Sequence, residues 1–351
     1  MDRRREILIG VELAGDGAHP AAWREAAHPP VDLLTPGRLA DTATAAESAG
    51  FGFLTFDDAT AGAPGDGVAG RFDPVEAAAF VSARTRRIGL VPVVDTAHAE
   101  PFHVSNQLSS LDHASLGRAG WLVGTDATEA RAAAYGVRHD PDTTALAQEA
   151  ADVVDAARRL WDSWQDDAVV ADEATGRFLD SDRVHHVDFR GATFSVRGPA
   201  LVPRPPQGQV VVLAPAGALP ADLVDVEVVT APTADGIVTA AAGVRAPRVL
   251  AEIEVVLDTD LPAVVRLAAL DAHTPWRAGP RLRHVGSSAG LVALLHRLAP
   301  HVDAVRLVPA VLDRDVPVLA AEVLPAFGSV GTGHTLRDRL DLPRPAGRYA
   351  S

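Results

Sequence analysis

Short apolar runs alternate with longer amphipathic segments along most of this chain. The clearest case lies between Arg86 and Thr125, where the apolar runs Ile88–Val94 and Ala119–Thr125 flank an amphipathic segment, Pro101–Ala114. Two parallel strands need a long crossover connection, which is usually a helix. This stretch therefore predicts a strand, a helix and a second strand that lies parallel to the first.

Eight apolar runs have the length of a strand. They are Ile7–Val11, Phe51–Phe56, Ile88–Val94, Ala119–Thr125, Gln209–Leu213, Val226–Thr230, Arg248–Leu257 and Ala304–Val308. Six helical segments lie between or after them: Pro36–Ala49, Asp73–Arg84, Pro101–Ala114, Thr144–Trp164, Ser288–Leu298 and Val316–Ala326. This α/β alternation favours a (β/α)8 TIM barrel. A doubly wound sheet is the alternative, although no glycine-rich dinucleotide fingerprint follows the first run.

A segment with a different sequence pattern interrupts the alternation of apolar runs and helical segments from about residue 165 to residue 208. It holds two short β-like pieces, Val184–Phe189 and Ala192–Val196, and a proline-rich exit. We expect one barrel domain over residues 1–351, with this insertion after the fourth strand–helix unit and a shortened C-terminal half. The Pro/Arg-rich end, from about residue 328 to residue 351, is expected to form a surface tail.

Composition excludes several kinds of chemistry. The chain has no cysteine and no lysine, which rules out disulfides, thiolate metal sites, Schiff bases and a phosphate-binding lysine. Its formal net charge is −14, whereas nucleic acid is bound by basic faces. No apolar run approaches the roughly 18 residues of a membrane span. The N-terminal residues are basic, and we expect them to lead into a first strand and not to form a signal peptide. We expect a cytoplasmic protein that binds neither nucleic acid, membrane nor metal.

Polar residues follow several of the predicted strands. Asp58 follows the second strand, Thr96 and His98 follow the third, and Thr125 ends the fourth. The carboxyl ends of the strands carry the active site of a parallel barrel. We therefore expect these side chains at one end of the barrel.

Eleven short motifs occur in order along the chain. They are HPAAWR (19–24), AESAGFGFLTFDD (46–58), RIGLV (87–91), EPFH (100–103), SLDH (110–113), GRAGW (117–121), LWDSW (160–164), TGR (175–177), RPPQG (204–208), TLR (335–337) and LPRP (342–345). Together they resemble the bacterial luciferase-like flavin monooxygenases. The branch they resemble contains the nitrilotriacetate, pristinamycin-synthase and dibenzothiophene-sulfone monooxygenases.

This resemblance implies a TIM barrel with insertions that acts as an oligomer. Family members take reduced FMN from a separate flavin reductase, react it with oxygen and oxygenate a small organic substrate. In such enzymes the cofactor activates oxygen and the protein supplies an oriented, shielded pocket. The resemblance implies that Asp58, Thr96 and Thr125 line the flavin and that His98 handles protons beside it.

The chain departs from the family pattern at several flavin contacts. The family Asn after Gly–Trp is Leu122 here, and the family Tyr at the start of the long helix falls at Thr144 or Thr143. After the fifth strand the family reads Gln–Ala–Gly–small–Ser, and the following helix holds the FMN phosphate on its N-terminus. This chain instead reads VVLAPAGA over residues 211–218, and it has no serine between Ser195 and Ser287. Arg138 and His139, just before the long helix, are the expected replacement.

Three functions stay open at this point. The first is a two-component monooxygenase that uses reduced FMN. The second is a degenerate, non-catalytic paralogue that acts as a partner subunit or ligand binder. The third is a deazaflavin-dependent oxidoreductase on the same fold.

Overall fold

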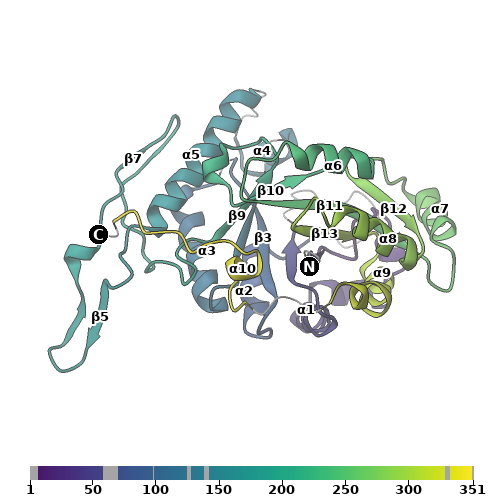
Figure 1. The fold of residues 1–351 in the computed structure, drawn as a ribbon, viewed down its shortest axis with the longest axis horizontal. Coiled ribbons are helices and arrows are strands. Elements are labelled where there is room, and N and C mark those ends of the chain that lie inside the picture. Colours follow the sequence, from purple (N-terminus) through teal and green to yellow (C-terminus); the bar gives the residue numbers. More distant parts are fainter. Residues whose placement is uncertain are drawn as a thin grey trace.

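The computed structural model describes residues 7–57, 70–97, 99–124, 128–137, 142–328 and 333–349. Eight parallel strands close a barrel around which helices are arranged (Figure 1). In spatial order the strands are β1 (Leu8–Glu12), β2 (Phe53–Phe56), β3 (Gly89–Asp95), β4 (Gly120–Gly124), β9 (Val211–Pro215), β10 (Val226–Val229), β11 (Arg248–Leu257) and β13 (Ala304–Pro309). Pairing of β13 with β1 completes the ring. The predicted barrel is confirmed, and the doubly wound alternative is wrong.

Helices follow most of the barrel strands. They are α1 (Pro36–Ala49), α2 (Pro74–Ser82), α3 (Pro101–Ser115), α4 (Glu129–Ala134), α5 (Thr143–Trp161), α6 (Ala234–Ala242), α7 (Ala263–His273), α8 (Ser288–Leu298), α9 (Leu312–Val318) and α10 (Leu336–Arg339). Side-chain caps fix several starts: Asp73 accepts main-chain N–H groups of α2, and Glu100 does the same for α3. The helix predicted to reach Trp164 ends at Trp161, because Trp164 pairs with Val184 in an isolated bridge.

A further strand, β12 (Leu282–Gly286), was not predicted. It pairs in parallel with the second half of β11, on residues Ile253–Leu257, beyond the part of β11 that pairs with β10. The last predicted helix, Val316–Ala326, begins earlier, as α9, and continues through a π-helical turn, Leu319–Val323.

The insertion consists of two antiparallel hairpins. The first joins β5 (Val169–Asp172) to β6 (Arg177–Leu179), and the second joins β7 (Phe189–Arg190) to β8 (Ser195–Val196). Figure 1 shows both hairpins projecting from one side of the barrel. The second hairpin matches the predicted β-like pieces, whereas the first was missed.

The C-terminal segment closes the amino-terminal end of the barrel. Leu336, Leu340 and Leu342 are buried in one cluster with side chains that point into the barrel, among them Phe53 and Leu213. The segment counted as a surface tail in the sequence is therefore partly a plug. Its apolar contacts follow from the barrel's need to fill the open end of its interior.

Polar side chains from distant motifs surround this plug. Arg337 of the TLR motif donates to Asp225, with its Nη1 atom 3.1 Å from Oδ1, and to the carbonyl oxygen of Gln209. Arg158 of α5 donates to the second oxygen of Asp225 at 2.9 Å. Arg204 of the RPPQG motif donates to Asp162 at 3.0 Å. These motifs therefore hold the barrel floor together.

Asp112, of the SLDH motif, is fully buried beside the same floor. Its carboxylate accepts hydrogen bonds from Gln207 Nε2 at 2.6 Å, Gln207 N at 3.3 Å and Ala119 N at 3.1 Å. Burial raises the pKa of Asp112 to about 6, because the carboxylate loses its hydration and the three donors only partly compensate.

Substitution Leu336→Ala is expected to lower the free energy of unfolding by about 2 to 5 kcal/mol, since it leaves a cavity in the plug. Chemical denaturation measures this loss. Leu201→Ala is the matched control, because Leu201 is 73% exposed, and it should change stability little. Equal effects of the two substitutions would contradict the plug.

The raised pKa of Asp112 predicts a pH dependence. The folded state holds this proton more tightly than the unfolded state, so the stability that Asp112 contributes declines as pH rises from about 4 to about 6. Across that pH range, the Asp112→Asn variant should gain about 3 kcal/mol of unfolding free energy relative to wild type. A difference that stays flat between pH 4 and pH 7 would refute this assignment.

Candidate functional site

The interior of the barrel at its carboxyl-terminal end carries an ion cluster. Glu12 of β1, Thr55 of β2, Glu252 of β11 and Arg306 of β13 are all buried. Arg306 is paired with both glutamates, and its Nε atom donates to Thr55 Oγ1 at 2.9 Å. Thr55 in turn donates to Glu12 Oε2 at 3.2 Å. Burial lowers the pKa of Arg306 to about 9, so the guanidinium stays charged at neutral pH.

The added strand β12 extends this cluster towards the rim. Arg281 Nε lies 2.7 Å from Glu252 Oε2, and Arg283 Nε lies 2.7 Å from Glu254 Oε2. The Arg283 guanidinium also stacks over the ring of Trp276, 3.7 Å from its centroid. On this side of the barrel mouth, each of these arginines is therefore paired with a neighbouring glutamate.

The opposite side of the mouth is formed by β3 and β4. Asp95, at the end of β3, forms a buried ion pair with Arg131 of α4, and their Oδ2 and Nη1 atoms are 2.6 Å apart. Thr96 is buried, and its hydroxyl donates to the carbonyl oxygen of Gly124 at 3.5 Å. Gly124 is required here, because a Cβ atom would lie 1.7 Å from the Asp95 carboxylate.

The predicted site residues are only partly described. Asp58, His98, Thr125, Arg138 and His139 lie outside the described residues. Thr96 lies at the barrel mouth, as predicted.

Thr144 is exposed in the first turn of α5. The main-chain N–H groups of Thr144 and Ala145 donate to Asp142 Oδ1, so a carboxylate already caps this helix. Among the described residues, no hydrogen bond joins Thr144 to Thr96.

Sequence reasoning missed the ion cluster. A signal was present, because Glu252, Glu254 and Arg306 interrupt buried apolar runs and Glu12 ends one. A charge in the middle of a buried strand points into a barrel that holds its partner.

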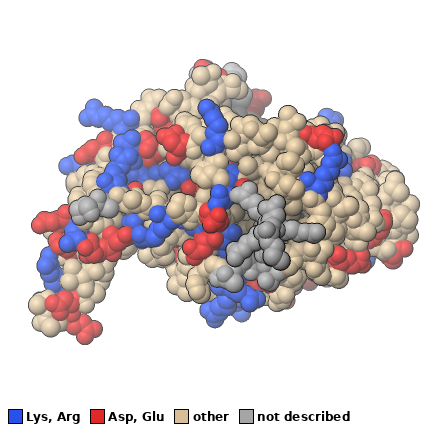
Figure 2. All heavy atoms as spheres, viewed as in Figure 1, with Lys and Arg blue, Asp and Glu red and all other residues tan. Residues whose placement is uncertain are grey.

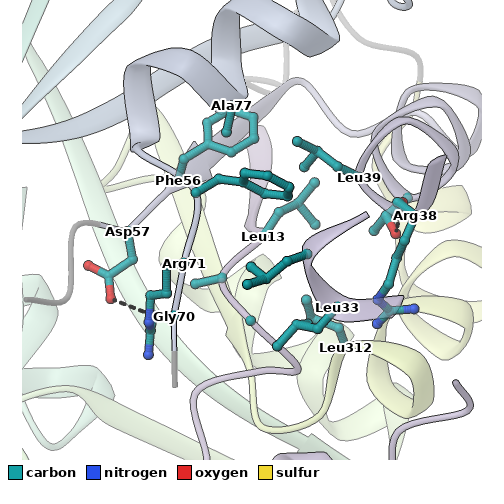
Figure 3. A pocket seen from close by; sticks show the side chains of 15 residues that line it. Leu13, Leu33, Arg38, Leu39, Phe56, Asp57, Gly70, Arg71, Ala77 and Leu312 are labelled. Carbon is teal, nitrogen blue, oxygen red and sulfur yellow. Dashed lines mark hydrogen bonds and ion pairs between the residues drawn. The ribbon is translucent and has the colours of Figure 1, made fainter. Parts of the chain in front are cut away.

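An apolar crevice opens beside the mouth, between the ends of β1 and β2 and the helices that follow them. Leucines, Phe56 and Ala77 point into it (Figure 3). Asp57 and Arg71 stand at one edge, 3.6 Å apart. Its volume is about 70 Å³, well below the roughly 300 Å³ at which ligand sites begin.

A second cavity, of about 280 Å³, lies at the insertion, between Trp164, Arg183 and Tyr349. Its charged side chains pair with one another: Arg183 with Asp167, and Arg204 with Asp166. This cavity is formed by the insertion and the C-terminal segment, away from the strand ends that carry the ion cluster.

The connection after β9 does not fit an FMN phosphate. It holds one 3-10 turn, Ala221–Leu223, where a phosphate-binding helix would need to begin. The N–H of Ala216 donates to Val228 O at 2.9 Å, and that of Ala218 donates to Pro215 O at 3.0 Å. These donors are already used, and no hydroxyl side chain is available in the connection.

Comparison with known proteins assigns the chain to a family. The family model described as luciferase-like monooxygenase matches residues 17–344. The chain belongs to this family. It is 35% identical over 213 residues to N-acetyl-S-(2-succino)cysteine monooxygenase of Bacillus subtilis (strain 168), covering 60% of this chain and 48% of that protein. It is 40% identical over 192 residues to one of the subunits of pristinamycin IIA synthase from Streptomyces pristinaespiralis, covering 54% of this chain and 62% of that protein.

The luciferase-like fold extends over nearly the whole chain. The solved structure of EDTA monooxygenase from Chelativorans sp. BNC1 superposes with a TM-score of 0.78 at 21% identity, covering 97% of this chain and 99% of that chain. The chain spans about half the length of the curated relatives it matches. In the described part of the chain, no helix combines the length and apolar character that crossing a bilayer requires.

Substitution Arg306→Met should lower the free energy of unfolding by about 3 to 5 kcal/mol, because it leaves Glu12 and Glu252 buried without their shared partner. The deficit should be larger at pH 8 than at pH 5, since the unpaired carboxyls can take up protons at the lower pH. Denaturation at both pH values measures it. Arg297→Met, at an exposed ion pair, is the control, and a pH-independent deficit would contradict the cluster.

Proposed function

We propose that this chain is the oxygenase component of a flavin-dependent two-component monooxygenase that acts on a small organic molecule. The observation that carries the proposal is the family match over residues 17–344 on a closed barrel. The relatives named above support it, since one is named as a monooxygenase of a substituted cysteine and the other as part of a synthase. A separate flavin reductase is the partner that this proposal requires.

In this function the bound reduced flavin activates oxygen, and the chain orients and shields it. The ion-paired mouth suits that task, because Asp95 with Arg131 and Arg283 with Glu254 present matched charges that need no water to neutralise them. Asp58, Thr96 and Thr125 are proposed to line the flavin. His98 is proposed to handle protons beside it.

The phosphate is the point at which this chain differs from the family pattern. Since the connection after β9 holds only a 3-10 turn and no hydroxyl side chain, we propose that reduced FMN is held through Arg138 and His139, in the connection between α4 and α5. Thr144 follows on the first turn of α5.

A second candidate is a non-catalytic barrel subunit that pairs with a flavin-binding chain. The connection after β9 favours it, because this connection has only a 3-10 turn and no hydroxyl side chain, as does the similarity to a relative that is named as a subunit. The deazaflavin alternative has support only from fold similarity, for example a TM-score of 0.62 at 15% identity to a secondary alcohol dehydrogenase that uses F420.

Anaerobic titration with reduced FMN and reduced riboflavin tests the proposal. Reduced FMN should bind at least about tenfold more tightly than reduced riboflavin, because one hydrogen bond to a charged group contributes about 1.5 to 3 kcal/mol. Arg138→Ala should remove most of this difference and leave riboflavin binding unchanged, whereas the control Arg277→Ala should alter neither.

Each other outcome is decisive. Equal affinities of wild type for the two flavins would overturn the phosphate assignment. Absence of binding for both flavins at high micromolar concentration would overturn the oxygenase proposal and favour the non-catalytic subunit.

A further inference from the structure

The added strand β12 brings two arginines to the barrel mouth, Arg281 directly before it and Arg283 within it (Figure 1). The two are separated by one residue, so their side chains lie on the same face of the strand. Each donates from Nε to a glutamate of β11 at 2.7 Å, Arg281 to Glu252 and Arg283 to Glu254. Because Glu252 also pairs with Arg306, the Arg281 guanidinium borders the ion cluster.

The two arginines differ in their terminal nitrogen atoms. Arg283 Nη1 donates to Trp276 O and its Nη2 donates to Arg277 O, both at 3.1 Å. Among the described residues, neither Nη atom of Arg281 has a hydrogen-bond partner. The Arg281 side chain is 35% exposed, whereas that of Arg283 is 17% exposed. Arg281 therefore presents charged donors that a ligand in the mouth can reach.

The protein as a whole is acidic. Its formal net charge is −14, and Figure 2 shows acidic and basic side chains next to one another over much of the viewed face. Long-range forces therefore repel anions, and an anion that binds has to be selected by local donors. A guanidinium with two available Nη groups is such a donor, because it matches a carboxylate in charge and in geometry.

The apolar crevice lies close to the same charges. Leucines and Phe56 point into it, and Asp57 stands at its edge (Figure 3). Burial lowers the pKa of Arg281, but carboxylates, led by Glu252 and including Asp57, outweigh burial and hold that pKa above its usual range. Arg281 and the edge of the crevice are thus near enough for their charges to interact.

The crevice has the size of a short apolar group. An apolar cavity of about 150 Å³ can hold a benzene molecule, and the volume of this crevice is about 70 Å³. It is too small for a whole ligand and suits a tail of about three carbon atoms, such as an isopropyl group. The charged side chains in its lining are paired, Arg38 with Asp313 and Arg71 with Asp57.

We propose that the substrate is a small organic acid, whose carboxylate binds the Nη groups of Arg281 and whose short branched apolar tail enters the crevice. This inference rests on the proposed function, because it names the molecule that the oxygenase would act on. Glu252 holds the Arg281 guanidinium through Nε, so the donors are oriented before the acid arrives. A neutral molecule of the same shape gains no charge-assisted hydrogen bond there.

Isothermal titration calorimetry without flavin tests the proposal. The probes are isobutyrate, isocaproate and isooctanoate, each with its amide, and acetate as an acid without a tail. The best branched acid should bind at least about tenfold more tightly than its amide, because a hydrogen bond to a charged group is strong. It should also bind at least about tenfold more tightly than acetate, since each buried CH2 group strengthens binding roughly fourfold. If no acid is preferred to its amide, or if acetate binds as tightly as every branched acid, the proposal is overturned.

Two substitutions separate the carboxylate contact from the tail contact. Arg281→Gln should abolish the preference for acid over amide, whereas the control Arg277→Gln, at an exposed arginine, should leave it intact. Ala77→Leu fills the crevice and should abolish the preference for the branched acid over acetate. Ala83→Leu, at the exposed end of α2, is its control. Equal effects of Arg281→Gln and Arg277→Gln would overturn the proposal.

These measurements do not depend on flavin binding. A protein that selects a branched acid and binds no reduced flavin would overturn the proposed oxygenase and leave the acid site in place. A protein that binds reduced flavin and prefers no acid to its amide would overturn the acid site alone.

Discussion

A single buried carboxylate, Asp225, holds together the parts of the chain on which the barrel depends. It precedes β10, accepts the N–H of Val212 in β9, and pairs with Arg158 of α5 and Arg337 of α10. Burial alone raises the pKa of Asp225, but the two arginines outweigh it and hold that pKa below its usual range. Without this charge, two guanidinium groups would lie buried at the barrel floor.

The two ends of the barrel differ in how closely they follow the family pattern. At the floor, the LWDSW, RPPQG and TLR motifs contact one another through Asp162, Arg204, Gln209 and Arg337. These motifs made the resemblance recognisable, and their role is structural. At the mouth, the connection after β9 has lost both the helix and the hydroxyl that suit a phosphate. The family match over residues 17–344 includes both ends of the barrel.

The barrel could be predicted because its strands are apolar runs of the right length. The predicted Arg248–Leu257 and the observed β11 have the same bounds, and so do the predicted Pro36–Ala49 and α1. β12 could not be predicted, because Arg283 within it and Arg281 directly before it make the segment look like a loop until their partners Glu252 and Glu254 are known. The first hairpin of the insertion was missed for a related reason, since its strands bury no common face.

For the candidate site, the sequence predicted the location but not the residues that interact there. Strand ends indicated the mouth, and Thr96 lies there. The cluster around Arg306 joins residues that are far apart in the sequence, so it needed the closed ring of strands to become visible. Thr144 was chosen by its place in the family pattern, but Asp142 already caps its helix.

The most direct test of the proposed function is the 31P NMR spectrum of reduced FMN with a small excess of protein. We predict a shifted phosphate resonance. We also predict that the second pKa of the phosphate falls below its ordinary value of about 6, because the positive charge of Arg138 favours the dianion. A resonance that coincides with that of free FMN at every pH would contradict phosphate recognition by this chain.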